Sequence, residues 1–273
     1  MKTRGPGRYR LLVLDLDGTV RSRVRGITPG VLEAVAAAQG RGVRVCVATG
    51  RMWPSAEPWV RALGADSPAI LYNGGQVLDF ASGRTLYERR LPRDAALGAL
   101  VLARRVHDVQ PLLYTRDRVF AERRHPLADA YALDDGLSYE IVSSLDALLD
   151  EDPYKLLIIG PSEHVDRLQE TVRGAGLPVH AVQSEPVYLE ILPPGVSKGT
   201  ALRAMIEILG IPAAATIAVG DNWNDLEMIE AAGLGVAMGS APEGVRARAN
   251  YVCGTAEEEG VGEVIERFLL RGA

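Results

Sequence analysis

Residues 11–19 of the chain read LLVLDLDGT, a run of four apolar residues that leads into Asp15 and Asp17. A continuous apolar run is typical of a strand that is buried on both faces of a parallel sheet. Asp15 then lies at the carboxyl end of that strand, where ligands bind in doubly wound sheets. The run is too short for a signal-peptide core or a membrane span. We therefore expect a cytoplasmic protein without a membrane partner.

The two ends of the chain alternate between strand and helix patterns. The predicted strands are 9–14, 43–48, 69–72, 216–219, 234–237 and 251–252, and the predicted helices are 29–40, 54–63, 198–209, 226–232 and 261–270. Thr28 is expected to cap the first helix, with Pro29 at its first position. This alternation indicates parallel strands joined by right-handed crossovers. The fold class is thus predicted to be α/β, with a doubly wound, Rossmann-like parallel-sheet core.

The middle of the chain has a different pattern. Short alternating segments at 85–88, 112–115, 119–122 and 187–192 indicate antiparallel strands, mixed with helices at 93–106 and 162–173 and a buried strand at 154–159. We predict an α+β domain at 86–190, inserted into a core made of 1–85 and 191–273. Asn73-Gly74-Gly75 is interpreted as the hinge turn into this insertion. The segment between Thr19 and Thr28 is too short for a lid, so the insertion must exclude water and select the substrate.

Composition narrows the class of protein. Hydrophobic residues make up 47% and charged residues 24% of the 273 residues, which is ordinary for a globular protein. Lys and Arg number 30 against 35 Asp and Glu, for a net charge of −5. This balance argues against nucleic acid as a partner, because a binding face for nucleic acid needs an excess of basic residues. No oligomeric state can be inferred from these features.

Acidic residues at predicted strand ends suggest phosphoryl transfer. Asp15 and Asp17 are two residues apart, so an extended chain turns both carboxylates to the same side. One can attack phosphorus while the other handles the proton of the leaving group. Crowded carboxylates facing a phosphate require a hard cation such as Mg²⁺, and Asp221 is the best additional ligand. Asp225 could orient Lys198 or hold a water on the metal.

A second group of residues suits the phosphate itself. Thr49 and Gly50 follow the second predicted strand, Lys198 opens a helix, and Asn224 lies beyond a later strand. Their hydroxyl, backbone N–H, ammonium and amide groups would stabilise the charge of the transferring oxygens.

These motifs, in this order, resemble the haloacid dehalogenase superfamily, in particular the Cof-type sugar-phosphatase-like hydrolases. The matching positions are Asp15 and Asp17 in the first motif, Thr49 in the second, Lys198 in the third, and Asp221, Asn224 and Asp225 in the fourth. The resemblance implies that Asp15 is the nucleophile, that Asp17 is the general acid/base and that the insertion is a mobile cap. It also implies that Mg²⁺ is bound by Asp15, the backbone carbonyl of Asp17, and Asp221. Trp223, inside the fourth motif, is bulkier than the family pattern suggests.

The expected function is a Mg²⁺-dependent phosphatase that acts on a small phosphorylated metabolite through an aspartyl-phosphate intermediate. A phosphomutase uses the same phosphoaspartate chemistry and is the alternative. A non-catalytic regulatory module is a third possibility, since response-regulator receivers also combine a phosphoacceptor Asp with Thr and Lys. A basic cluster in the insertion is either a solvated face or a contact for the substrate anion; its members are Arg116, Arg118, Arg123, Arg124 and His125.

Overall fold

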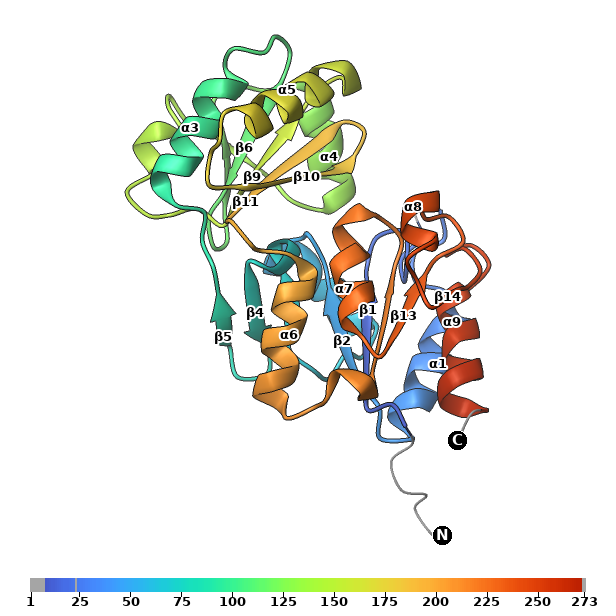
Figure 1. Cartoon of the computed structure of the whole chain (residues 1–273). Helices are drawn as coiled ribbons and strands as arrows, with labels where there is room; N and C mark the ends of the chain where they lie inside the picture. Colours follow the sequence, from blue (N-terminus) through green and yellow to red (C-terminus); the bar gives the residue numbers. More distant parts are fainter. Residues whose placement is uncertain (1–7, 23, 272–273) are drawn as a thin grey trace. The chain divides into compact units, whose positions relative to one another are not determined.

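The computed structural model describes residues 8–22 and 24–271, which form two compact units (Figure 1). The core unit comprises 1–50, 56–87 and 197–273 as far as they are described. The inserted unit comprises 51–55 and 88–196, whereas the sequence pattern places the insertion at 86–190. The short segment 51–55, which comes after the second predicted strand, is thus grouped with the inserted unit.

The core unit is built on an eight-stranded sheet in the order β14-β13-β12-β1-β2-β3-β4-β5. Its strands are β1 (Leu11–Asp15), β2 (Arg44–Ala48), β3 (Ala69–Leu71), β4 (Gln76–Asp79), β5 (Arg84–Glu88), β12 (Thr216–Gly220), β13 (Leu234–Ala237) and β14 (Tyr251–Val252). The strands from β14 to β3 pair in parallel, and β4 runs antiparallel to β3. The chain moves outward from β1 on one side and from β12 on the other. The boundary between β1 and β12 is therefore the topological switch point, where such sheets bind ligands.

Helices cover both faces of the core sheet (Figure 1). They are α1 (Pro29–Gln39), α2 (Trp53–Ala62), α6 (Lys198–Leu209), α7 (Leu226–Ala231), α8 (Glu243–Arg246) and α9 (Gly260–Ile265). On one face α6 and α7 pack on apolar side chains of β1, β2 and β3, and on the other α1 packs against α9. Thr28 caps α1, accepting from the backbone N–H of Val31 at 3.4 Å, with Pro29 at its start. The predicted doubly wound α/β class is confirmed.

The inserted unit has a six-stranded sheet in the order β10-β11-β9-β6-β7-β8. Its elements are α3 (Arg93–Ala103), β6 (Gln110–Tyr114), β7 (Val119–Ala121), α4 (Pro126–Asp135), β8 (Glu140–Ile141), β9 (Lys155–Ile159), α5 (Ser162–Gly174), β10 (His180–Glu185) and β11 (Tyr188–Leu192). All pairs are antiparallel except β7 with β8. Helices α3 and α5 pack side by side, and their apolar side chains form one core with those of the sheet.

One expectation about the connection between the units is wrong. Asn73-Gly74-Gly75 does not lead into the insertion, because the chain first adds β4 and β5 to the core sheet. The turn instead joins β3 to β4, and both Tyr72 and Asn73 adopt a positive φ of 53° there. The sequence pattern also does not indicate α4 or β10, which the structure contains.

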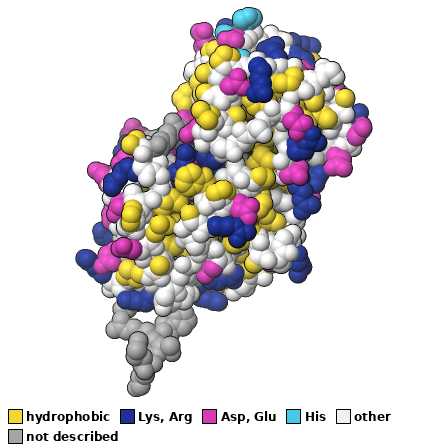
Figure 2. Space-filling model, turned by 180° about the vertical axis from the view of Figure 1, so that it is seen from behind, with side chains coloured by type: hydrophobic (Ala, Val, Ile, Leu, Met, Phe, Trp, Pro, Cys, Tyr) yellow, Lys and Arg dark blue, Asp and Glu magenta, His cyan; other side chains and the backbone are white. Residues whose placement is uncertain are grey.

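No described helix combines the length and the apolar character needed to cross a membrane. On the face shown in Figure 2, Lys and Arg side chains are interspersed with Asp and Glu side chains.

Candidate active site

Asp15 and Lys198 form the centre of the candidate site in the core unit. Asp15 is the last residue of β1 and only 5% exposed, and Lys198 is the first residue of α6 and 1% exposed. Ser197 caps α6 in a capping box with Thr200, which fixes the point where the lysine side chain leaves the helix. The Lys198 Nζ lies 2.5 Å from Asp15 Oδ1. A residue at a strand end and one at a helix start, far apart in sequence, thus meet in a buried ion pair.

Asp225 completes this pair from a third segment. Its Oδ1 accepts from Lys198 Nζ at 2.6 Å. Its Oδ2 accepts from the backbone N–H groups of Asp221 at 2.9 Å and Asn222 at 3.1 Å. Asp225 is fully buried, so both of its oxygens serve to hold the lysine and the loop after β12 in place.

Asp221 comes directly after β12 and lies beside the loop after β1. Thr19 Oγ1 donates to Asp221 Oδ1 at 3.4 Å. The two loops approach so closely at Gly18 that a Cβ there would lie 2.3 Å from Asp221 Oδ2. Gly18 also has a φ of +84°, a backbone conformation that residues with a side chain rarely adopt. The glycine of the DGT sequence is therefore required both by its backbone conformation and by the neighbouring carboxylate.

The electrostatics of these groups reflect an excess of negative charge. Burial raises the pKa of Asp15 to about 7, and the charge of Asp225 adds to the rise while Lys198 opposes it. Burial likewise raises the pKa of Asp221 to about 9, together with the charges of Asp15 and Asp225. Burial alone would lower the pKa of Lys198, but Asp15 and Asp225 outweigh it and hold that pKa above its ordinary value. One ammonium thus does not compensate the carboxylates around it.

The same acidic residues fit a metal ion. One oxygen from each of Asp15, Asp221 and Asp225 lies within 4.8 Å of the others. Carboxylate oxygens are the ligands that hard divalent cations prefer, and such a cation would offset the burial and the neighbouring negative charges that raise these pKa values. Because both oxygens of Asp225 are already hydrogen-bonded, Asp15 and Asp221 are the carboxylates available as ligands.

The residues expected to hold phosphate oxygens lie around one asparagine. Thr49 comes after β2, is 1% exposed, and its backbone carbonyl accepts from the N–H of Asn73 at 3.1 Å. A Cβ on Gly50 would lie 3.1 Å from the Asn73 amide. Asn224 Nδ2 donates to Asn73 Oδ1 at 3.1 Å. Asn73 Nδ2 and Asn224 Oδ1 are buried and have no hydrogen-bond partner within residues 8–22 and 24–271. Asn73, which the sequence pattern indicates as a turn residue, is therefore a further candidate for contact with a ligand.

Asp17 lies apart from the buried acidic group. Its Oδ1 accepts from Arg21 Nη1 at 2.8 Å, and 38% of its side chain is exposed. The loop folds back so that the Arg21 N–H donates to the Leu16 carbonyl at 2.7 Å and the Gly18 N–H to the Arg21 carbonyl at 2.9 Å. The Arg21 guanidinium also lies over the Trp59 ring, 4.8 Å from its centroid. Asp17 is thus the more accessible carboxylate, and Arg21 and Trp59 are neighbours that the motif does not indicate.

Comparison with known proteins identifies the family of the chain. Residues 12–265 match the family model of haloacid dehalogenase-like hydrolases. The chain belongs to this family. Among solved structures, a haloacid dehalogenase-like hydrolase from Bacteroides thetaiotaomicron has a TM-score of 0.85 at 31% identity, covering 95% of this chain and 99% of that one. A HAD subclass IIB sugar phosphatase at 21% identity has a TM-score of 0.82 over 95% of this chain and 98% of that one, which shows a shared fold.

Curated relatives of this family member are mainly phosphatases. The pyridoxal phosphate phosphatase YbhA of Escherichia coli is 30% identical over 96% of this chain and 99% of its own length. The 5-amino-6-(5-phospho-D-ribitylamino)uracil phosphatase YitU of Bacillus subtilis is 30% identical over 94% and 97%. The chain spans about half, 47%, of an Arabidopsis thaliana relative named endoribonuclease YBEY, chloroplastic, at 28% identity over 96% of this chain. Family and full-length relatives make the chain a phosphoric monoester hydrolase of Cof type.

Proposed function

We propose that this enzyme hydrolyses small phosphorylated metabolites in two steps, with Mg²⁺ as cofactor and with Asp15 as the phosphoryl acceptor. The observation that carries the proposal is the buried Asp15 carboxylate at the switch point of the sheet, held by Lys198 at 2.5 Å and flanked by Asp221. A carboxylate nucleophile needs fixed orientation and a nearby positive charge when it faces a phosphate. Lys198 supplies both, and Asp225 holds Lys198.

In the first step, an Asp15 oxygen attacks phosphorus and the ester bond to the leaving group breaks. Asp17 gives its proton to the departing oxygen. In the second step, water attacks the phosphorus of the aspartyl phosphate while Asp17 takes a proton from it, which releases inorganic phosphate and restores Asp15. The partial exposure of Asp17 suits this role, because its carboxyl must exchange protons with both the leaving group and water.

The remaining groups bind the ion and the phosphate. Asp15, Asp221 and the backbone carbonyl of Asp17 are the proposed ligands of Mg²⁺, which when bound supplies the positive charge that phosphate and crowded carboxylates require. Thr49, the N–H of Gly50, and Asn224 are proposed to bind the non-bridging phosphate oxygens. The proposed substrate class is that of the relatives, which are named as phosphatases of pyridoxal phosphate and of 5-amino-6-(5-phospho-D-ribitylamino)uracil.

The test uses the purified chain with Mg²⁺ and p-nitrophenyl phosphate. We expect turnover that EDTA abolishes and Mg²⁺ restores, and that is lost in Asp15→Asn without loss of the folded circular-dichroism spectrum. Asp17→Asn is the matched variant. It should keep the metal affinity yet accumulate phosphorylated Asp15 after rapid quenching, detected by mass spectrometry of the peptide that contains 11–19. Turnover that survives in EDTA contradicts the proposed role of the metal, and turnover that survives Asp15→Asn contradicts the proposed role of Asp15 as nucleophile.

A labelling experiment separates hydrolysis from phosphoryl migration. With a sugar phosphate in ¹⁸O-labelled water, hydrolysis places label in the released phosphate. Isomerised sugar phosphate without release would instead show a phosphomutase.

A further inference from the structure

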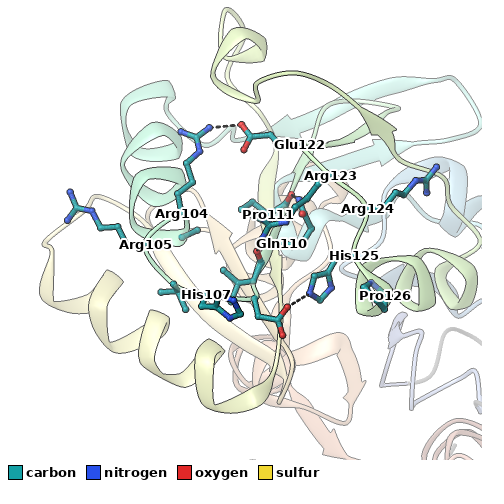
Figure 3. A pocket seen from close by; sticks show the side chains of 14 residues that line it. Arg104, Arg105, His107, Gln110, Pro111, Glu122, Arg123, Arg124, His125 and Pro126 are labelled. Carbon is teal, nitrogen blue, oxygen red and sulfur yellow. Dashed lines mark hydrogen bonds and ion pairs between the residues drawn. The ribbon is translucent and has the colours of Figure 1, made fainter.

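The inserted unit contains a pocket of about 680 Å³ that shares no residue with the candidate active site. It lies between the C-terminal end of α3, the start of β6, and the segment that joins β7 to α4 (Figure 3). Its volume falls in the range of small-molecule sites. All of its lining residues belong to the inserted unit.

A buried glutamine gives the pocket a fixed hydrogen-bond acceptor. Gln110 is 1% exposed, and its Nε2 donates to the carbonyl of Pro111 at 2.8 Å. This bond settles the orientation of the amide, because the reversed amide would place two oxygens in contact. Oε1 is then buried without a partner in the described part of the chain. Buried polar atoms nearly always have a partner, so this oxygen indicates a missing donor.

A buried histidine offers a second acceptor. His125 is 7% exposed, and its Nε2 lies 3.2 Å from Asp108 Oδ1. A carboxylate can only accept, so the proton of the ring is on Nε2 and Nδ1 is left as an acceptor in the neutral ring. Nδ1 is also buried and has no partner in the described ranges 8–22 and 24–271. Figure 3 marks this contact of the His125 ring with a dashed line.

The lining of the pocket carries four arginines against two carboxylates. Of the basic cluster in the sequence, Arg118 and Arg124 pair with Glu140 and Asp129. Arg123, by contrast, donates from Nη2 to the carbonyl of Val109 at 2.9 Å. It has no carboxylate partner among the described residues, and Figure 3 shows it at the centre of the pocket.

A second arginine at the rim adds to this charge. Arg105 also lines the pocket and forms no ion pair among the described residues, and its side chain extends outward in Figure 3. Arg104 is neutralised by Glu122 and Asp146. An anion in the pocket would therefore meet Arg123 first, with Arg105 at the edge.

We propose that this pocket is a second ligand site, which binds a small anion that also carries hydroxyl groups, such as a sugar acid or a sugar phosphate. The carboxylate or phosphate faces Arg123, and the hydroxyl groups donate to Gln110 Oε1 and His125 Nδ1. Neither the anionic group alone nor the hydroxyl groups alone would satisfy the residues that line the pocket. An inorganic anion offers no donors to the two acceptors, and a neutral sugar leaves the guanidinium without a counter-charge. The site is separate from the one in which we place hydrolysis.

The test uses the full chain with ¹⁵N-labelled histidine, observed by NMR, with gluconate as the main probe. Gluconate has no phosphoester, so turnover does not interfere, and the chain has 4 histidines, so the His125 signal can be assigned by substitution. We expect a saturable shift of the His125 Nδ1 resonance on titration with gluconate or, in EDTA, with glucose 6-phosphate. Glucose should produce no comparable shift.

Arg123→Gln is the decisive variant, with Arg118→Gln, at the opposite end of β7 and outside the pocket lining, as the matched control. We expect Arg123→Gln to weaken gluconate binding at least tenfold, since it removes a charged donor, and Arg118→Gln to leave it unchanged. Both variants should unfold at the same denaturant concentration as the parent chain, because both side chains are exposed. No His125 shift up to about 10 mM of either anion, or equal affinity in both variants, overturns the proposal.

Discussion

Arg21→Met should slow the hydrolysis of alkyl phosphates more than that of p-nitrophenyl phosphate. Arg21 Nη1 lies 2.8 Å from Asp17 Oδ1, and stacking on Trp59 limits the positions that the guanidinium can take. Methionine keeps an apolar stem over the ring and removes the charged donor. If Arg21 aims the carboxyl of Asp17 at the leaving group, its loss matters only where the leaving group needs a proton. An alkoxide needs one, whereas p-nitrophenolate does not.

The size of the effect depends on the exposure of the pair. Arg21 is 12% and Asp17 38% exposed, so solvent screens the carboxylate end and the pair contributes about 0.5–1 kcal/mol. If this free energy is lost from the transition state alone, the rate falls about two- to fivefold. The parameter to compare is kcat/KM, because it reports the steps up to departure of the leaving group and excludes hydrolysis of the intermediate, which needs Asp17 for every substrate.

Two variants complete this experiment. Trp59→Leu frees the guanidinium without removing it and should give a smaller selective loss. Arg61→Met breaks an exposed pair with Glu57 on α2, the helix that also carries Trp59, and should leave kcat/KM unchanged for both substrates. Equal losses for the two substrates in Arg21→Met would refute the positioning role and leave Arg21 as a structural residue.

Three further outcomes are expected. Lys198→Met should destabilise the fold by about 3–5 kcal/mol in chelator, measured by urea unfolding, because it leaves Asp15 and Asp225 buried without their partner; a loss below 1 kcal/mol, roughly that of an exposed pair, contradicts this. In chelator, stability should fall as the pH rises, because burial raises the pKa of Asp15 from 3.8 to about 7 and that of Asp221 from 3.8 to about 9. The folded state then binds more protons than the unfolded state. The stabilisation from these protons is therefore complete below the pKa of the unfolded carboxyls and is lost as the pH rises through the pKa values of the folded ones; a flat profile of unfolding free energy against pH argues against it. Asn73→Gly keeps the positive φ and removes the amide, so kcat/KM should fall roughly tenfold or more with little change in the unfolding midpoint; unchanged kinetics would exclude Asn73 from the site.

The core sheet could be predicted because its signal is local and strong. Val43–Ala48, for example, is apolar at nearly every position, and β2 is buried along Val45–Ala48. Parallel strands place their carboxyl ends at one edge, so polar residues at the ends of such strands are expected to meet. This rule depends only on strand direction. It therefore led to Asp15 and Asp221 without any knowledge of side-chain contacts.

The elements that escaped prediction lack such a signal. In α4, Leu133 is 85% exposed and Leu127 is 36% exposed, so its apolar residues do not mark a buried face. Strand β10 is half-buried along its whole length and alternates poorly. The turn at Asn73 could be predicted, but Asn-Gly-Gly does not determine whether a core strand or the insertion comes after it. The chain there adds an antiparallel strand, and the Asn73 amide at the turn lies beside Asn224.

The motifs also could not determine the hydrogen-bond partners of the side chains in the site. Asp225 was expected either to orient Lys198 or to hold a water on the metal, and its two engaged oxygens favour the first. That division has a consequence for folding. Asp225 holds the only described lysine of the group, whereas burial and the neighbouring carboxylates raise the pKa values of Asp15 and Asp221. The fold thus retains a local excess of negative charge where the chemistry needs a cation, and cation binding should stabilise the protein at the same carboxylates that it prepares for reaction.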